Sequence, residues 1–365
     1  MKIDITATGT PPHASEIFIG EDVMERVASG LETALGGRSA YWIWDEGVWP
    51  LWGRKALDLG WPTQRDRRVI LFSASEPNKR LTSVEFLARR LVNAGANRDS
   101  ALIAVGGGVT GDVTGFVASI YMRGIPYFQV PTSLLAQVDS SIGGKTGVDL
   151  PEGKNLLGTF QQARQVYIDP RFLSTLPDEE LRQGMAEVIK SAMIGDEVLW
   201  KFVENSSDSI KKRDLETLLR IISASCLLKS RIVQEDERES GRRRVLNLGH
   251  TVGHALEKLS GFSSRHGDCV ATGMVAAATL SHRLGKMRDG DLERLEEICK
   301  VWEMPIRIPA SIDSQAIVDT IRTDKKRIGE KLHFILPVRI GKVIEITDID
   351  NGEFTWVLKS LGAGG

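Results

Sequence analysis

The chain has 365 residues, of which 42% are hydrophobic and 26% are charged, and its 47 basic residues nearly balance 48 acidic ones. Such a composition is typical of a soluble globular protein, and a net charge of −1 favours neither nucleic acid nor an anionic membrane as a partner. The first residues lack an apolar segment, and no run approaches eighteen apolar residues, so neither secretion nor membrane spanning is indicated. The three cysteines are widely spaced, which fits a reducing compartment, and we expect a cytoplasmic protein.

The first half of the chain alternates short apolar runs with segments of helical periodicity. The predicted strands are residues 40–44, 68–72, 101–105 and 127–130, and the helices predicted between them are residues 50–60 and 81–94. This alternation indicates a largely parallel sheet with crossover helices. Because ligands of such sheets gather at the carboxyl ends of the strands, the residues that follow each strand are the candidates for binding.

Polar and glycine residues follow three of these strands. Asp45 follows the first, Glu76 and Lys79 follow the second, and the glycine-rich string 106–112 follows the third. A helix predicted to begin near Gly111 would point its positive N-terminus at this loop, where a nucleotide diphosphate would fit. The string also satisfies G-x-G-x-x-G, but no acidic residue stands about twenty positions later to bind a ribose, so an ordinary Rossmann dehydrogenase is not favoured.

The next segment gathers cations in predicted glycine-rich loops. Residues 139–147 and 153–155 contain Lys145 and Lys154, and Arg123 shortly precedes them. Clusters of cations and amide donors of this kind bind phosphate or carboxylate, although a solvated surface loop is an alternative interpretation.

From residue 177 onward the pattern is mostly helical. Amphipathic helices are predicted at residues 179–194, 196–205, 214–231, 246–259, 267–284 and 290–302. A basic loop is predicted at residues 323–327, and short β segments at 331–336 and 342–346. We therefore predict an α/β Rossmann-like domain in residues 1–176 and a mostly α-helical domain in residues 177–365, with the active site in the cleft between them.

Histidines concentrate between residues 243 and 266. Asn247, His250 and His254 are three and four positions apart, so they would share one face of a helix, and a second element would bring His266 back to them. A lone histidine usually fills or caps a helix, but three within seventeen positions favour a site for a zinc-like ion, since histidine is its commonest ligand.

A carboxylate that could complete this site lies on the helix predicted at residues 179–194. Glu187 and Lys190 share one face of that helix, and their neighbours are apolar, which indicates burial. The pair could be an ordinary helical salt bridge, but an unpaired buried charge is costly and a metal would compensate it. One glutamate and two histidines with open positions form a catalytic zinc set.

Together these motifs resemble the 3-dehydroquinate synthase family, within the sugar phosphate cyclases. The strings that carry the resemblance are Gly-Gly-Gly-Val-Thr-Gly-Asp (106–112), Tyr-Met-Arg-Gly (121–124), Val-Pro-Thr-Ser-Leu-Leu-Ala (130–136), Asp-Ser-Ser-Ile-Gly-Gly-Lys-Thr (139–146), Gly-Lys-Asn (153–155), Gly-Met-Ala-Glu-Val-Ile-Lys (184–190) and Asn-Leu-Gly-His-Thr-Val-Gly-His-Ala-Leu-Glu (247–257). They follow one order over about residues 40–330. The resemblance implies conversion of 3-deoxy-D-arabino-heptulosonate 7-phosphate to 3-dehydroquinate and phosphate, in the shikimate pathway, by transient oxidation, phosphate elimination, reduction and aldol closure.

The resemblance also implies NAD and one divalent metal, zinc or cobalt, as cofactors. By similarity, the metal ligands are Glu187, His250 and His266. The residues that match NAD positions are Asp45, Glu76, Lys79, Gly107, Gly108, Val109, Asp112, Thr132, Ser133, Lys145 and Lys154. Those that match catalytic positions are Lys145, Lys190, Lys229, Arg243, Asn247 and His254, and those that match other substrate positions are Arg123, Asp139, Lys154, Asn155 and Lys325. In this family the arginine that matches Arg123 reaches a neighbouring subunit's site, so a homodimer is implied.

Three other functions are compatible with parts of this pattern. Another sugar phosphate cyclase would share the fold and cofactors, but Asn155, Arg243 and His254 suit a substrate with both carboxylate and phosphate. A metal-dependent polyol dehydrogenase would not need so many cations near the glycine loop. A non-catalytic scaffold protein would be expected to have lost part of the metal set, which is complete here. The tryptophans of residues 42–52 are expected to pack the first domain.

Overall fold

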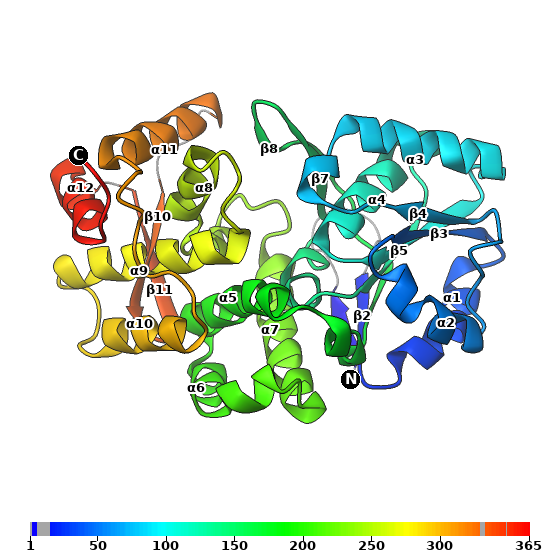
Figure 1. Ribbon diagram of the computed structural model, residues 1–365, viewed down its shortest axis with the longest axis horizontal. Coiled ribbons are helices and arrows are strands. Elements are labelled where there is room, and N and C mark those ends of the chain that lie inside the picture. The colour runs from blue at the N-terminus through cyan, green and yellow to red at the C-terminus, as the bar shows by residue number, and fades with distance from the viewer. Residues whose placement is uncertain (1, 6–14, 329–332, 348) are drawn as a thin grey trace. The chain divides into compact units, whose positions relative to one another are not determined.

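The computed structural model describes residues 2–5, 15–328, 333–347 and 349–365, with side chains for all of these except 2–5 and 324–328 (Figure 1). Backbone contacts divide the chain into two compact units. Unit 1 comprises Met1–Leu181 and Arg213–Arg238, and unit 2 comprises Arg182–Lys212 and Glu239–Gly365. The boundary predicted at residue 176 lies near the end of the first segment of unit 1, whereas the return of Arg213–Arg238 to that unit was not predicted.

Unit 1 is built on a seven-stranded sheet in which only the pairing of β1 with β2 is antiparallel. In spatial order its strands are β1 (Lys2–Ile5), β2 (Ser15–Ile19), β9 (Gln165–Ile168), β6 (Tyr127–Pro131), β5 (Ser100–Gly106), β3 (Ser39–Asp45) and β4 (Val69–Phe72). Every residue of β5, an interior strand of the sheet, is buried, as expected for a parallel strand covered on both faces. The four strands predicted from apolar runs are confirmed.

Helices cover both faces of this sheet (Figure 1). The helices of unit 1 are α1 (Val23–Leu35), α2 (Trp49–Asp58), α3 (Leu81–Ala94), α4 (Gly108–Ile120) and α7 (Leu215–Glu235). On one face, α1 and α2 pack against a core that includes Trp42 and Trp44 of β3, which confirms the packing role expected for the tryptophans. The alternate side chain Tyr41 faces α3, where its hydroxyl donates to Ala94 O at 3.3 Å. Helix α4 begins at Gly108, three residues earlier than predicted, because the glycine loop is itself its first turn.

The lysine-containing segment after β6 is a β-hairpin, not the pair of loops that the glycines predicted. Strands β7 (Lys145–Leu150) and β8 (Gly153–Phe160) pair antiparallel. Gly147 and Gly158 lie opposite each other, and a Cβ at either position would lie within 2.5 Å of a backbone oxygen of the other strand. The glycines therefore permit a close approach of two strands, a requirement that resembles a loop signal in the sequence.

Unit 2 is mostly helical, as predicted, with one two-stranded sheet. Its elements are α5 (Asp178–Gly195, which starts in unit 1), α6 (Glu197–Lys211), α8 (His250–Leu259), α9 (His266–Arg283), α10 (Asp291–Val301), α11 (Ser314–Ile328), α12 (Asn351–Ser360), β10 (Phe334–Arg339) and β11 (Lys342–Ile346). Helix α9 is the most deeply buried of them, and α8, α10, α12 and β10 pack around it. Within the described ranges, no helix combines the length and apolar character needed to span a membrane.

Two predicted elements of unit 2 are wrong in detail. The helix predicted at residues 246–259 is divided into a 3-10 helix, η5 (Arg242–Asn247), and α8, with Gly249 in the left-handed region at φ 79°. A Cβ on Gly273 of α9 would lie 1.9 Å from the carbonyl oxygen of Gly249, so this backbone contact fixes the break. The basic loop predicted at residues 323–327 lies in α11, whose buried Ile317, Val318 and Ile321 have helical spacing.

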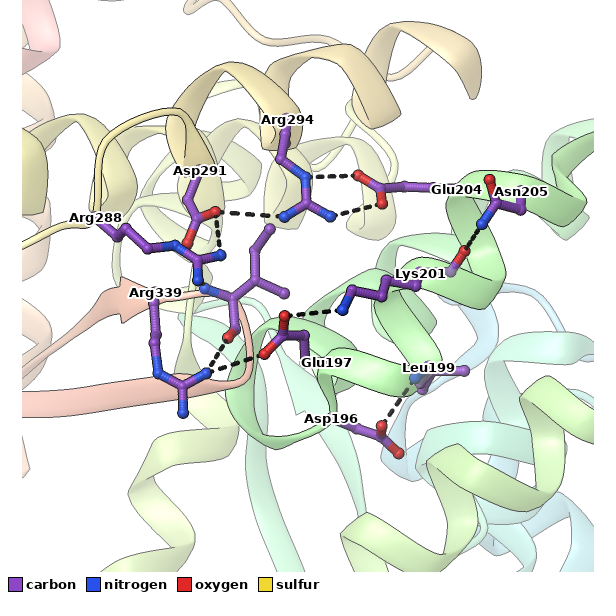
Figure 2. Close-up of polar contacts among 11 residues, drawn as sticks. Asp196, Glu197, Leu199, Lys201, Glu204, Asn205, Arg288, Asp291, Arg294 and Arg339 are labelled. Atoms are coloured by element: carbon purple, nitrogen blue, oxygen red, sulfur yellow. Dashed lines mark hydrogen bonds and ion pairs between the residues drawn. The ribbon is translucent and has the colours of Figure 1, made fainter.

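A polar network ties α6 and α10 to the turn between β10 and β11 (Figure 2). Asp291, in the first turn of α10, is only 1% exposed. Its carboxylate accepts hydrogen bonds from Arg288 at 2.7 Å and from the backbone N–H of Ile340 at 2.9 Å. Arg294 donates to Glu204 of α6 through two nitrogens, at 3.0 and 2.7 Å. The buried charge of Asp291 is therefore compensated entirely by protein groups.

Candidate metal and substrate site

Three ligand side chains from three helices of unit 2 converge on one point. Glu187 lies on α5, and His250 and His266 are the first residues of α8 and α9; one donor atom of each lies within 4.8 Å of the others. Glu187 Oε1 is 3.8 Å from His250 Nε2 and 3.5 Å from His266 Nε2, which is too long for a good hydrogen bond. Zinc bonds of about 2.1 Å would separate neighbouring tetrahedral ligands by roughly 3.4 Å. The spacing therefore fits a shared divalent ion.

The second ring nitrogen of each histidine is held by an acceptor. His250 Nδ1 lies 3.2 Å from the carbonyl oxygen of Leu248, and His266 Nδ1 lies 2.7 Å from Glu257 Oε1. With Nδ1 protonated, Nε2 of each ring carries the lone pair directed to the shared point. Glu257 is 2% exposed. A buried carboxylate that accepts the second ring N–H of a histidine is the usual support of a histidine that binds a metal. Glu257 lies within the motif of residues 247–257, but no role was predicted for it from the sequence.

The electrostatics of the site favour the metal-binding forms of Glu187 and His250. Burial would raise the pKa of Glu187, but the positive charges of Lys190 and His266 beside it outweigh burial and lower that pKa to about 2. Burial, reinforced by the charge of Lys190, lowers the pKa of His250 well below its usual value. Neither carboxylate oxygen of Glu187 has a hydrogen bond of normal geometry to a described residue, although Lys190 forms an ion pair with it. An ionised, incompletely satisfied carboxylate beside a neutral imidazole is suited to a cation.

His254 lies one turn after His250 on α8, with ring centroids 5.1 Å apart, and it is outside the set of three converging ligands. This placement puts His254 beside the candidate metal site but outside its set of ligands.

The short helix η5 carries two more predicted residues of unit 2. Arg243 is 2% exposed, and Asn247 donates its amide Nδ2 to Glu239 Oε1, so its Oδ1 is left for a ligand. The neighbouring Arg244 lies 3.5 Å from Glu345 on β11, which anchors η5 to the small sheet. Glu239 was not identified from the sequence, because it lies outside the helical pattern of the histidines. Lys325 lies in α11, and its side chain is outside the part of the chain that the structure describes.

In unit 1, the glycine loop presents a helix N-terminus. Gly107 precedes the first residue of α4, and no side chain of the described residues caps that end of the helix. The N–H of the buried Thr132 donates to Gly106 O at 2.9 Å, which places the end of β6 beside the loop. Burial raises the pKa of Asp45, at the end of β3. Uncapped amide groups at a helix N-terminus are suited to a diphosphate.

The structure joins residues predicted for NAD to residues predicted for the substrate. Lys79 is 6% exposed and donates to Asp112 Oδ2 at 2.6 Å and to Asn155 Oδ1 at 2.7 Å. Burial opposes the charge of Lys79, but the adjacent Asp112 carboxylate raises its pKa, so the ammonium persists. Lys154 forms an ion pair with Glu76 at 2.8 Å. Lys79 and Glu76, which follow β4 and were predicted to bind NAD, are thus in contact with the β7–β8 hairpin.

Two further cations of unit 1 differ in their surroundings. Lys229 of α7 donates to Asp139 Oδ1 at 2.6 Å and to its backbone oxygen at 2.8 Å, so these two predicted residues are in contact. Arg123 is exposed and lies at φ 68°, between Met122 at 50° and Gly124 at 110°. Three consecutive residues in the left-handed region turn the chain sharply there. Lys145 is exposed at the start of β7.

This architecture is that of the sugar phosphate cyclases. The chain aligns with 2-deoxy-scyllo-inosose synthase, solved with carbaglucose-6-phosphate, NAD⁺ and Co²⁺, over 99% of its length and 100% of that chain, with a TM-score of 0.83 and 30% identity. It also has the fold of 2-epi-5-epi-valiolone synthase from Streptomyces hygroscopicus, solved with NAD⁺ and Zn²⁺, with a TM-score of 0.88 at 24% identity over 97% of this chain and 98% of that one.

Within that class, the chain belongs to the 3-dehydroquinate synthase family. The model of the N-terminal region of 3-dehydroquinate synthase matches residues 69–183, and that of the C-terminal region matches residues 184–327. The 3-dehydroquinate synthase of Symbiobacterium thermophilum is 43% identical over 94% of this chain and 97% of its own length. The resemblance found in the motifs is therefore confirmed.

Proposed function

We propose that this protein is a 3-dehydroquinate synthase that eliminates phosphate from 3-deoxy-D-arabino-heptulosonate 7-phosphate and closes the carbocycle of 3-dehydroquinate. The observation that carries the proposal is the convergence of the buried Glu187 with the part-buried His250 and His266 beside Lys190, in a chain that matches this family over most of its length. The reaction class is that of a carbon–oxygen lyase dependent on NAD and a divalent metal.

Glu187, His250 and His266 would hold the metal, zinc or cobalt, with positions left for substrate oxygens. A divalent ion there would polarise a hydroxyl and then the carbonyl formed from it. Lys190 and Arg243, 2% exposed each, would stabilise the negative charge that develops on the substrate, because cations shielded from water act strongly on nearby charge. Asn247 would accept a hydrogen bond from a substrate hydroxyl through Oδ1, since its Nδ2 is occupied by Glu239.

The N-terminus of α4, with Gly107, Gly108, Val109, Thr132 and Ser133, would bind the diphosphate of NAD. NAD would accept hydride from the substrate and return it within one cycle. Lys79 would hold Asp112 in place at this end of the helix, because their ion pair is buried.

Cations of unit 1 would bind the anionic groups of the substrate. Lys145, Lys154 and Asn155 lie on the β7–β8 hairpin, and Lys229 is held by Asp139. We further propose a homodimer in which the exposed Arg123 completes the site of the neighbouring chain. Size-exclusion chromatography with light scattering tests the dimer, and mixing Arg123→Ala with Glu187→Ala chains tests the shared site. Partial recovery of activity in the mixture is expected.

A second candidate is another sugar phosphate cyclase, favoured by the 30% identity to 2-deoxy-scyllo-inosose synthase. Incubation of the protein with NAD, cobalt and either the heptulosonate phosphate or glucose 6-phosphate separates the two. We expect phosphate release from the heptulosonate phosphate, with a cyclic product visible by NMR, and none from glucose 6-phosphate. The reverse pattern would contradict the proposed substrate.

A further inference from the structure

Three residues of unit 1 form a closed ring of hydrogen bonds around Asn155. The backbone N–H of Asp149 donates to the carbonyl oxygen of Lys79 at 2.7 Å. Asp149 Oδ1 accepts from the backbone N–H of Asn155 at 2.7 Å, and Asn155 Oδ1 accepts from Lys79 Nζ at 2.7 Å. The ring thus connects the end of β7, the start of β8 and the loop that follows β4. Asp149 was not among the residues selected from the sequence.

The ring holds Asn155 in an uncommon backbone conformation. Asn155 lies at φ 54°, in the left-handed region that few residues other than glycine and asparagine adopt. The pairing of β7 with β8 shifts between Val148 and Leu150, so that Asp149 alone faces residues 154–156. In such a bulge the extra residues lose their ladder partners and a side chain is redirected. Asp149 supplies the missing acceptor for the N–H of Asn155.

The same ring fixes which way the side-chain amide of Asn155 is oriented. An ammonium group can only donate, so the amide atom next to Lys79 must be the oxygen. Among the described residues, the amide Nδ2 of Asn155 has no hydrogen-bond partner. The residue is exposed, and Lys154 precedes it in the sequence. The group that Asn155 offers to a ligand is therefore a donor, which selects an acceptor such as an anionic oxygen.

We propose that Asp149 is a positioning residue for substrate binding, and that through the ring it makes Asn155 a hydrogen-bond donor to an anionic oxygen of the substrate. This inference rests on the proposed function for the identity of the substrate. Asp149 itself does not touch the substrate. Its carboxylate orders the bulge, and the Lys79 ammonium, held by Asp112, orients the amide.

The test compares Asp149→Ala, which removes the acceptor, with Asp149→Asn, which retains an oxygen in its place. Asp149→Ala should raise KM for the heptulosonate phosphate about tenfold, the effect of one hydrogen bond, while kcat stays within about twofold. Asp149→Asn should recover most of the affinity. Glu152→Ala, an exposed residue of the same turn, is the matched control and should behave as the wild type. An unchanged KM in Asp149→Ala, or no recovery in Asp149→Asn, would overturn the positioning role.

A second variant tests whether the side-chain amide of Asn155 acts as a hydrogen-bond donor. Asn155→Asp keeps the oxygen that faces Lys79 but replaces the donor by a carboxylate, so it should weaken substrate binding more than Asn155→Ala does. Equal or tighter binding by Asn155→Asp would contradict the donor role. If the inhibition constant of inorganic phosphate rises in parallel, the acceptor is the phosphate of the substrate, and if it is unchanged the acceptor is its carboxylate. Either result supports donation to an anionic oxygen.

Hydrogen–deuterium exchange separates this inference from the proposed function. The amide of Asn155 should be protected in the wild type and in Asp149→Asn, and it should exchange rapidly in Asp149→Ala. This readout needs no substrate. If the wild type does not release phosphate from the heptulosonate phosphate but the exchange pattern holds, the proposed function fails and the ring stands. Rapid exchange at Asn155 in the wild type would refute the ring itself.

Discussion

Unit 2 contains two carboxylates, Asp291 and Glu187, that are each only 1% exposed. Asp291 accepts hydrogen bonds from an arginine and a backbone N–H, and two arginines lie beside it (Figure 2). Glu187 has an ion pair with Lys190 and two histidine nitrogens at distances that suit a shared ion better than a hydrogen bond. An ionised carboxylate is costly to bury unless its charge and lone pairs are matched. The protein alone matches Asp291, whereas we propose that a cation completes the environment of Glu187.

The largest effect is expected where the cation is needed. Glu187→Gln should lower kcat for phosphate release by about 10³-fold, close to 4 kcal/mol, because a neutral amide is a poor metal ligand. The same substitution at the exposed Glu179, on the same helix, should leave the rate unchanged. A Glu187→Gln enzyme with more than about a tenth of the wild-type rate would show that this carboxylate is not a ligand.

Removal of the Asp291 carboxylate should affect the stability of the protein and not its metal binding. Asp291→Ala leaves the buried N–H of Ile340 without its acceptor and frees the half-exposed Arg288, so we expect the free energy of unfolding in urea to fall by about 2 kcal/mol, mostly from the unmatched N–H. The affinity for metal should be unchanged. Asp289→Ala, at an exposed neighbouring position, serves as the control. If Asp291→Ala lost its metal without losing stability, the distinction between the two carboxylates would be invalid.

Glu257 should have an intermediate effect, because it supports a ligand without binding the ion. Glu257→Gln keeps an oxygen near His266 Nδ1 but removes its charge, so metal affinity measured by competition with a chelator should fall about 10- to 100-fold. Asp268→Asn is a suitable comparison, since Asp268 lies on α9, the helix of His266, but contacts Arg182 and Gln183. Equal affinities for Glu257→Gln and wild type would contradict the supporting role.

The smallest effect concerns pH. In the metal-free protein, burial would lower the pKa of His266, but Glu187 and Glu257 outweigh it and raise that pKa to about 9. Below pH 9 a metal must therefore displace a proton from this imidazole, so apparent affinity should rise about tenfold per pH unit up to pH 9 and then level off. Calorimetry at pH 7.5 in buffers of different ionisation enthalpy should detect the release of about one proton. Affinity independent of pH between 7 and 9 would be inconsistent with this charge balance.

Much of the metal site could be predicted from the sequence because its signals are local. Glu187 stands among apolar residues at helical spacing, which indicated burial, and three histidines lie close together. The spacing alone could not separate His254 from the ligands, since a helix face places it as near as His250. The structure separates them, because α9 begins at His266 and brings that residue, and not His254, to Glu187 and His250.

What the sequence could not reveal depends on contacts between distant segments. The break at Gly249 follows from its contact with Gly273, and the hairpin of β7 and β8 depends on the opposition of Gly147 and Gly158. Asp149 has no motif of its own, and its role exists only because the bulge brings it to Asn155. Likewise, α7 has an ordinary amphipathic pattern, and only packing assigns it to unit 1.

The most direct test of the difference between the two buried carboxylates is the metal content of three purified proteins: the wild type, Glu187→Gln and Asp291→Ala. After dialysis against cobalt and removal of excess ion, mass spectrometry of the metal should find about one ion per chain in the wild type and in Asp291→Ala, and almost none in Glu187→Gln. One ion per chain in Glu187→Gln would contradict the assignment of the buried carboxylate to the metal.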